Sequence, residues 1–413
     1  MTPTPTLPDS AARACAVAAV LVFGALARLV LAVLVDPGLD EAYAIAVSSR
    51  WQLSWFDHPP MTFWWVAAMR ALAAPFFGAD VPAVVLRLPF VAAFTVTSWA
   101  ILDITRRLWG ARAGLWALIA LTLAPFFLVS AGSWLVPDGP LVLFLALTAR
   151  ALVMILFEAP DPRRERRLWL LAGLTLGLAG LSKYHAALFA LAAFAFLLAT
   201  PHRRRLATPG PWLAAVIAGL TVTPVLIWNA ENGWVSFLFQ AARGGGGGVS
   251  WIGFGRAIVG QLAYLAPWTA IGALAATVAA LRADRRADGP AAFLAALAVL
   301  PIGLFTAVPL FGGDSLPHWQ MPGWLFLLPL LGRAVAEAET RRSPIPRLAR
   351  LFARLAVALL TLAALAVGAL RVLPPSREIV ERFRLENALA EATAWGGLVE
   401  GLDAAGLLAP DAA

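Results

Sequence analysis

Long apolar runs, separated by short polar connections, recur along almost the whole chain. A helix of roughly 20 apolar residues crosses a 30 Å hydrocarbon core, and its backbone groups are all bonded within the segment, as lipid requires. Each run is therefore expected to be a helix. The pattern predicts about eleven spans, at 12–35, 83–105, 113–132, 138–157, 168–182, 184–200, 211–229, 257–281, 291–310, 321–338 and 351–373.

The connections between these runs alternate in charge. Every second connection after 83–105 is rich in arginine, whereas those at 133–137, 183, 230–256 and 311–320 are poor in Lys and Arg. Basic connections face the cytoplasm, so the others, with the loop at 36–82, are expected to face the periplasm or its equivalent. Arg13 then also lies inside.

The apolar run 61–77 fits this alternation only if it does not cross. It carries Arg70, and a full crossing would force the N-terminus to the outside. We therefore expect a half-buried interfacial helix in the first outer loop. The predicted organisation is all-α: a transmembrane domain over 1–373, with loop 36–82 carrying the chemistry, and a short outer amphipathic tail over 374–413.

Composition agrees with a membrane protein. The chain has 61% hydrophobic and 14% charged residues, against about 25% charged residues in a soluble domain. A net charge of +8 could indicate nucleic acid, but the arginines cluster in short loops between apolar runs. Lipid headgroups explain them better than nucleic acid does. Cys15 is the only cysteine, so no intrachain disulfide can form.

Two outer segments place acids at predicted helix starts. Asp40 and Glu41 open a short helix in the first outer loop, and Asp138 follows Pro137 at the start of the run 138–157. Such carboxylates can simply cap helices or suit the helix dipole. On one membrane face they also make a converging pair, and ionisable groups at that depth are candidates for function.

Cations and histidines occur on the same predicted side. Lys183 is the only lysine among 32 Lys and Arg residues; it is either a snorkelling side chain or a partner for an anion. Arg243, His58 and His318 lie in other outer loops, among tryptophans. Carboxylates suit deprotonation of a hydroxyl, and cations suit a phosphate group. Walker, GxSxG and HExxH motifs are absent.

At these residues the chain resembles the dolichyl-phosphate-mannose protein mannosyltransferases, in their bacterial glycosyltransferase family 39 branch, near the aminoarabinose transferases of lipid A. The matching pieces span about 40 to 323 and are, in order, Asp40-Glu41-Ala-Tyr43, His58-Pro-Pro-Met, Pro137-Asp138-Gly-Pro-Leu, Gly177-Leu-Ala-Gly-Leu-Ser-Lys183-Tyr184, Trp228-Asn229 through Asn232-Gly-Trp-Val-Ser-Phe, Gly260-Gln261-Leu, and Pro317-His318-Trp319 with Pro322-Gly.

The resemblance implies a C-type membrane glycosyltransferase in a bacterial inner membrane, with its active site facing the periplasm. Such enzymes move a sugar from a polyprenyl-phosphate carrier to an acceptor. The motifs then imply Asp40 as general base or acceptor-orienting carboxylate, with Glu41 beside it, and Asp138 as a second acid. They also imply a substrate-binding set at the carrier phosphate and sugar, formed by His58, Lys183, Tyr184, Arg243, His318 and Trp319.

Several points stay open. The acids could hold a divalent metal, but no ligand spacing defines a site. Relatives often have a larger outer domain, so the short tail favours a lipid or glycan acceptor, such as lipopolysaccharide, over a protein. Two other functions compete with transfer: a flippase of polyprenyl-linked sugars, and a non-catalytic envelope assembly protein whose acids are helix caps. A nearly uncharged middle of the bundle argues mildly against a flippase.

Overall fold

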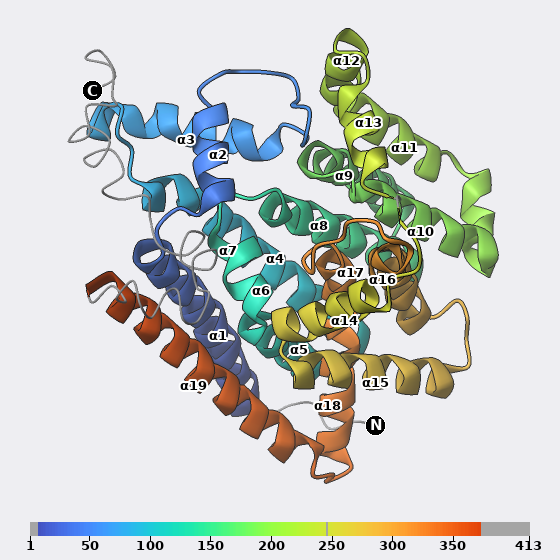
Figure 1. Ribbon diagram of the computed structural model, residues 1–413. Coiled ribbons are helices and arrows are strands. Elements are labelled where there is room, and N and C mark those ends of the chain that lie inside the picture. The colour runs from blue at the N-terminus through green and yellow to red at the C-terminus, as the bar shows by residue number, and fades with distance from the viewer. Residues whose placement is uncertain (1–6, 245–246, 373–413) are drawn as a thin grey trace, which may run out of the picture.

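The computed structural model describes residues 7–244 and 247–372, and over these ranges all regular structure is helical. The all-α expectation is therefore confirmed, and Figure 1 shows the helices gathered into one bundle. The predicted amphipathic tail 374–413 lies outside the described residues.

The helices follow one another with short connections. In chain order they are α1 (Leu7–Leu34), α2 (Leu39–Val47), α3 (Met61–Phe77), α4 (Ala83–Trp109), α5 (Ala111–Leu123), α6 (Pro125–Leu128), α7 (Ser130–Ser133), α8 (Asp138–Phe157), α9 (Pro162–Ser182), α10 (Ala186–Ala199), η1 (Pro201–Ala207), α11 (Pro209–Thr221), α12 (Thr223–Glu231), α13 (Val235–Ala242), α14 (Trp251–Leu265), α15 (Pro267–Asp284), α16 (Pro290–Ala307), η2 (Val308–Phe311), α17 (Met321–Leu325), α18 (Leu328–Thr340) and α19 (Ile345–Val372).

The described helices support a multi-pass membrane protein. Five of them are long and apolar enough to cross a membrane, and the number rises to nine if each of four bent helix pairs is one span. The two predicted spans outside that count are 168–182, in α9, and 321–338, which is divided between α17 and α18. The count of about eleven stays a prediction.

Two predicted spans are sharply bent, which the hydropathy pattern did not show. The run 257–281 is divided into α14 and α15, whose axes differ by 100°. The bend falls at Ala266, which has φ 67° and precedes Pro267; a residue before proline is disfavoured in the helical conformation. The run 113–132 breaks by 81° before Pro125, between α5 and α6. Both bends turn a helix end toward the cavity described below.

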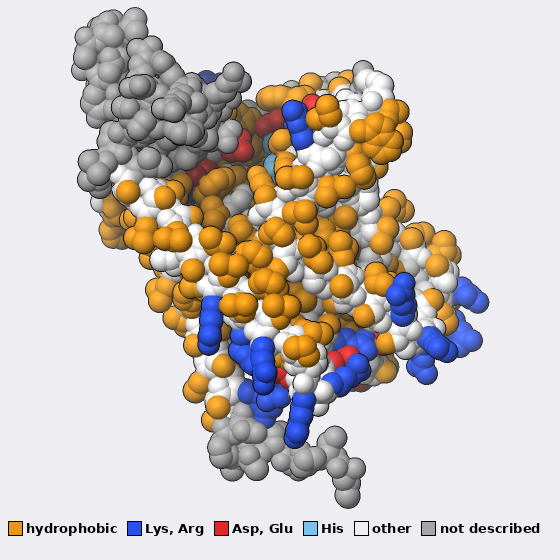
Figure 2. Space-filling model, turned by 60° about the horizontal axis from the view of Figure 1, so that its bottom comes forward, with side chains coloured by type: hydrophobic (Ala, Val, Ile, Leu, Met, Phe, Trp, Pro, Cys, Tyr) orange, Lys and Arg blue, Asp and Glu red, His pale blue; other side chains and the backbone are white. Residues whose placement is uncertain are grey.

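The arginine-rich connections share one end of the molecule. Ion pairs join one basic connection to the next: Arg107 contacts Glu158 at 2.7 Å, and Arg112 lies 3.7 Å from Glu339. Arg205 likewise pairs with Glu165. Figure 2 shows the Lys and Arg side chains gathered along the lower part of that view, below a largely hydrophobic belt, with acidic side chains in a hollow at the upper edge. We call this arginine-rich end the basic end.

The predicted outer connections meet at the opposite end. The loop 48–60 is held by α12 and α13, since Trp228 Nε1 donates to Gln52 Oε1 at 3.1 Å and Ser236 Oγ donates to the Trp55 carbonyl at 2.7 Å. The Asp314 amide donates to the Arg243 carbonyl at 3.0 Å, which joins the loop 312–320 to the end of α13. Three connections that the charge pattern assigned to one side, 36–82, 230–256 and 311–320, are therefore in contact with one another.

The predicted interfacial helix 61–77 is α3. It has 17 residues, fewer than a typical span, and a proline at position 75. Arg70 Nη2 donates to the Ile45 carbonyl at 2.6 Å, which ties α3 to α2. Figure 1 shows α2 and α3 together at the end where α1 stops. The position of α3 at a membrane surface stays a prediction.

Helices α5 and α18 pack so closely that a methyl group would not fit between them. A Cβ at Gly332 would lie 2.4 Å from the Ala113 carbonyl oxygen and 2.7 Å from the Ala117 amide nitrogen. Both are backbone atoms, which cannot rotate away. Gly332→Ala is therefore expected to lower the free energy of unfolding by about 1–3 kcal/mol, measured by thermal or denaturant unfolding in detergent.

Gly219 provides the matched control, because a Cβ there meets no atom within 4 Å. Gly219→Ala removes a helix-interior glycine and is expected to leave stability unchanged or to raise it by about 0.5–1 kcal/mol. Equal stability of the two variants would contradict the close α5–α18 contact.

Candidate active site

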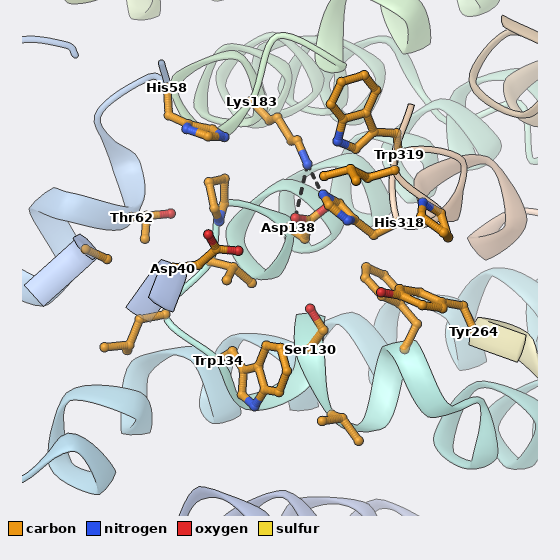
Figure 3. A pocket seen from close by; sticks show the side chains of 18 of the residues that line it. Asp40, His58, Thr62, Ser130, Trp134, Asp138, Lys183, Tyr264, His318 and Trp319 are labelled. Atoms are coloured by element: carbon orange, nitrogen blue, oxygen red, sulfur yellow. Dashed lines mark hydrogen bonds and ion pairs between the residues drawn. The ribbon is translucent and has the colours of Figure 1, made fainter. Parts of the chain in front are cut away.

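A cavity of about 650 Å³ lies at the end opposite the basic end. Its walls come from seven separate parts of the chain, and Figure 3 shows their side chains converging on a common space. The lining includes Asp40, Tyr43, Asp57, His58, Thr62, Phe126, Ser130, Trp134, Asp138, Lys183, Arg243, Tyr264, His318 and Trp319. The acids, cations and histidines predicted from separate loops are thus mostly brought together, with exceptions given below.

Asp40 presents a free carboxylate to this cavity. Helix α2 begins at Leu39 with Gly38 as its N-cap, so Asp40 is in the first turn and does not cap the helix. Its side chain is exposed and points into the cavity in Figure 3. Over the described ranges no hydrogen bond or ion pair engages its oxygens. Asp40 can therefore accept a proton from a bound hydroxyl group.

Glu41 faces the other way and does not line the cavity. Its carboxylate is buried against Arg87, whose Nε donates to Oε1 at 2.8 Å, and it also accepts from the Leu135 amide at 3.0 Å. Glu41 further accepts from the Gly38 amide, which completes the capping box of α2. The geometry corrects the predicted catalytic role of Glu41: both oxygens are occupied in holding α2 against α4 and the loop before α8.

Asp138 and Lys183 form a buried ion pair in the cavity wall. Lys183 Nζ lies 3.0 Å from Oδ1 and 3.1 Å from Oδ2 of Asp138, and the two side chains are only 7% and 4% exposed. Pro137 is the N-cap of α8, so Asp138 is not a cap. Nor does Lys183 snorkel to water. An ammonium group has three donors, so two can bond Asp138 while the third is available to a ligand.

Asp57 is a cavity residue that the sequence analysis did not select. Its Oδ1 accepts from the Tyr43 hydroxyl at 3.0 Å, and its Oδ2 lies 2.9 Å from His58 Nδ1. Burial alone would raise the pKa of Asp57, but the hydrogen bonds from His58 and Tyr43 bring that pKa below its usual value. Burial and the nearby Asp57 raise the pKa of the Tyr43 hydroxyl, so Tyr43 stays a donor.

The sequence did contain a signal for this network. Asp57 and His58 are adjacent and precede two prolines, and Tyr43 falls one helical turn after Asp40, on the same face of α2. The distance of 14 residues between Tyr43 and Asp57 is bridged only by the fold. Gln240 Nε2 of α13 donates to the Asp57 carbonyl at 2.7 Å and holds this part of the loop in place.

Arg243 is a second cation at the cavity. It ends α13, and its guanidinium lies 4.7 Å from the ring centroid of Trp319 and 5.4 Å from that of Phe239. No carboxylate pairs with it in the described part of the chain. A planar guanidinium held between rings can make two parallel hydrogen bonds to a phosphate. Trp319, predicted to bind substrate, lines the cavity beside it.

His318 lines the cavity as a neutral group. Burial, and secondarily the Lys183 ammonium, lower the pKa of His318 to about 4. At neutral pH the ring can therefore donate or accept a hydrogen bond but supplies no positive charge to a phosphate. Its ring is nearly parallel to that of Phe126, with the two centroids 6.5 Å apart. The Phe126 ring also stacks on the Tyr264 ring, with their centroids 5.8 Å apart.

Tyr184 is the predicted substrate-binding residue that does not reach the cavity. Its ring packs against Phe237 with the centroids 5.3 Å apart. Its hydroxyl is buried, with no hydrogen-bond partner among the described residues. Tyr184, in the turn between α9 and α10, therefore packs against α13, and in this structure it does not join Lys183 at the cavity.

The described residues include no group of three His, Cys, Asp or Glu side chains that could hold a metal ion. Asp40 is unpaired, Asp57 bonds Tyr43 and His58, and Asp138 bonds Lys183. The acids of the cavity therefore do not fit a preformed three-ligand site, and no step below uses a metal.

Comparison with known proteins agrees with this architecture. Residues 57–228 match the family described as dolichyl-phosphate-mannose-protein mannosyltransferase. A search of the curated proteins finds no match. Among solved structures, the chain is similar to ArnT from Cupriavidus metallidurans in two states.

The ArnT structure bound to undecaprenyl phosphate has a TM-score of 0.64 and 17% sequence identity, covering 86% of this chain and 72% of that one. The apo structure has a TM-score of 0.59 and 21% identity, covering 78% of this chain and 60% of that one. The likeness shows the fold, which is that of the C-type membrane glycosyltransferases. The resemblance found in the sequence is confirmed.

Proposed function

We propose that this protein is a glycosyltransferase of C-type fold, which transfers a monosaccharide from a polyprenyl-phosphate carrier to an acceptor hydroxyl at the periplasmic face of a bacterial inner membrane. One observation carries the proposal. The unpaired carboxylate of Asp40 and the cations Lys183 and Arg243 lie on separate elements around a single cavity. A base and a phosphate-binding group therefore face a common space.

The carrier is proposed on two grounds. A sugar phosphodiester bears one negative charge, which Lys183 and Arg243 can match; an ArnT of the same fold was solved with undecaprenyl phosphate bound. The cavity also lies at the end where α2 and α3 meet the predicted outer loops, and in the proposed orientation this end faces the outer leaflet. The basic end would then face the cytoplasm.

The reaction follows from this arrangement as a single displacement. The acceptor O–H gives its proton to Asp40 while its oxygen attacks the anomeric carbon. The bond from that carbon to the phosphate oxygen breaks, and its electron pair leaves with the polyprenyl phosphate. Lys183 and Arg243 stabilise the charge that grows on the departing phosphate. Attack from the opposite side inverts the anomeric configuration.

Asp138 has a positioning role in this scheme. Its carboxylate is bonded to Lys183, so it fixes the ammonium in the wall and does not itself abstract a proton. Cavity volume and aromatic lining suit a sugar, since Phe126, Tyr264 and Trp319 offer apolar ring surface beside polar groups. We propose an envelope lipid or glycan, such as lipopolysaccharide, as the acceptor.

The test begins with a deletion strain of the source bacterium. Mass spectrometry of its envelope lipids and surface polysaccharide is expected to show the loss of one sugar residue from one component. Purified protein in detergent, added to detergent-solubilised membranes of the deletion strain, is expected to restore that mass. A flippase cannot do this in solubilised membranes, because it needs two separated compartments. An unchanged envelope, or no restoration by the purified protein, would refute the proposal.

A further inference from the structure

The cavity holds a second proton-carrying group that the displacement above does not use. His58 Nδ1 is bonded to Asp57, so the other ring nitrogen, Nε2, is left for the cavity. Figure 3 shows the His58 ring directed toward the Lys183 side chain, which is bonded to Asp138. His58 therefore stands on the phosphate side of the site.

The surroundings of His58 fix its ring and place a carboxylate beside it. Asp57 is held anionic by its two hydrogen bonds, and Tyr43 keeps its proton as a donor. A carboxylate on Nδ1 fixes the ring orientation and stabilises the ring when both nitrogens carry protons. The side chain of Asp57 is only 13% exposed and that of His58 is 29% exposed, so water reaches His58 but largely not its partner.

The geometry points to His58 as the general acid for the departing phosphate, with Asp57 as its positioning residue and Tyr43 as the support of Asp57. This inference rests on the proposed function and adds a proton donor to it. The departing phosphate monoester gains a second negative charge as its bond to the sugar breaks, and a positioned proton donor beside it stabilises that charge in the transition state.

The step balances without any further reactant. As the anomeric carbon–oxygen bond breaks, the phosphate oxygen takes the proton from His58 Nε2. The acceptor proton goes to Asp40, and the new carbon–oxygen bond forms. Asp40 then passes its proton through cavity water to His58, which restores the starting state. The net change moves one proton from the acceptor hydroxyl to the released polyprenyl phosphate.

Other charged groups around the site act on this proton. Those that line the same cavity, from every element packed around it, are Asp40 and Tyr43 of α2, Asp57 of the same loop, Asp138 of α8, Lys183 after α9, Arg243 after α13, Tyr264 of α14 and His318 of the loop 312–320. His185, just before α10, is buried behind the wall and also interacts electrostatically with His58. The Lys183 charge is matched by Asp138, and Asp57 is the carboxylate bonded to His58.

The experiment measures the initial rate of sugar transfer against pH, with purified protein added to membranes of the deletion strain. Binding of undecaprenyl phosphate is measured separately, by the fluorescence of the cavity tryptophans. Wild-type protein is expected to lose rate as the pH rises above neutral, since only protonated His58 can donate. His58→Gln is expected to be about 100-fold slower, with the alkaline loss gone and binding within about threefold.

Two more variants separate acid catalysis from simple charge. His58→Lys keeps a positive charge and is expected to keep binding but not the rate, because a lysine of ordinary pKa about 10.4 is a poor acid at neutral pH. Asp57→Asn is expected to be about tenfold slower, with its alkaline loss moved to lower pH. Tyr43→Phe provides a milder perturbation should Asp57→Asn fail to fold.

His202→Gln is the matched control, since His202 lies in η1 and contacts the Asp288 carbonyl far from the cavity. Wild-type rate and pH profile in His58→Gln would overturn the inference. So would a loss of binding as large as the loss of rate, or full activity in His58→Lys, because either would make His58 only a phosphate-binding cation. If wild-type protein itself transfers no sugar, the proposed function fails instead.

Discussion

Asp40→Asn is expected to lower the rate of sugar transfer about 1000-fold while leaving the fold intact. The amide has the size of the carboxylate but cannot take a proton from the acceptor. Asp40 makes no hydrogen bond or ion pair in the described structure and does not cap α2, so its replacement breaks no contact. The measurement is the initial rate with deletion-strain membranes, beside the thermal unfolding temperature in detergent.

Asp80→Asn is the control for this prediction, because Asp80 is an exposed carboxylate between α3 and α4 and does not line the cavity. Its rate is expected to equal that of the wild type. Undecaprenyl phosphate binding should be kept in Asp40→Asn, since the base does not hold the phosphate. A folded Asp40→Asn protein that transfers sugar at the normal rate would remove Asp40 from the mechanism and would favour a non-catalytic role.

Lys183→Met is expected to lower the free energy of unfolding by about 3–5 kcal/mol and to abolish transfer. The substitution keeps much of the side-chain volume but leaves Asp138 buried without its partner. It also removes a donor that would meet the carrier phosphate. Stability is measured by denaturant unfolding in detergent, and activity at a temperature where the variant is still folded.

The double variant Asp138→Asn with Lys183→Met separates these two effects. Removing both charges is expected to recover most of the stability, because no buried charge is left unpaired. Activity is not expected to return, since the phosphate still lacks the ammonium. Arg341→Met serves as the control, because its pairing with Glu337 is exposed at the basic end and contributes little. An active double variant would exclude Lys183 from phosphate binding.

Much of the fold could be predicted from hydropathy and charge. The helix over 61–77 has the predicted bounds. The connections that the charge pattern assigned to the outer side meet around one cavity. Both follow from short-range rules: apolar length determines which segments can be helices in lipid, and arginine content determines which side a loop takes. The bends after Leu123 and Leu265 were missed, because hydropathy reports burial in lipid and carries no information on axis direction.

The candidate site was likewise predicted only in part from the sequence. Sequence motifs selected Asp40, Asp138, Lys183 and Arg243, and all four line the cavity. They also selected Glu41, which the fold turns away to Arg87. On a helix, adjacent residues differ by about 100° in direction, so a motif that names both cannot say which one faces the cavity.

Sequence by itself determined that this chain is a helical membrane protein whose candidate site residues, Asp40, Asp138, Lys183, His58 and His318 among them, belong to connections of one side, since hydropathy and charge act locally along the chain. Tertiary structure alone decided which of those groups are free and which are paired. Among the described residues Asp40 makes no hydrogen bond or ion pair, Lys183 forms an ion pair with Asp138, and His58 is hydrogen-bonded to Asp57. Pairing depends on distances of a few ångströms between residues far apart in sequence, and only the packing of the helices sets those distances.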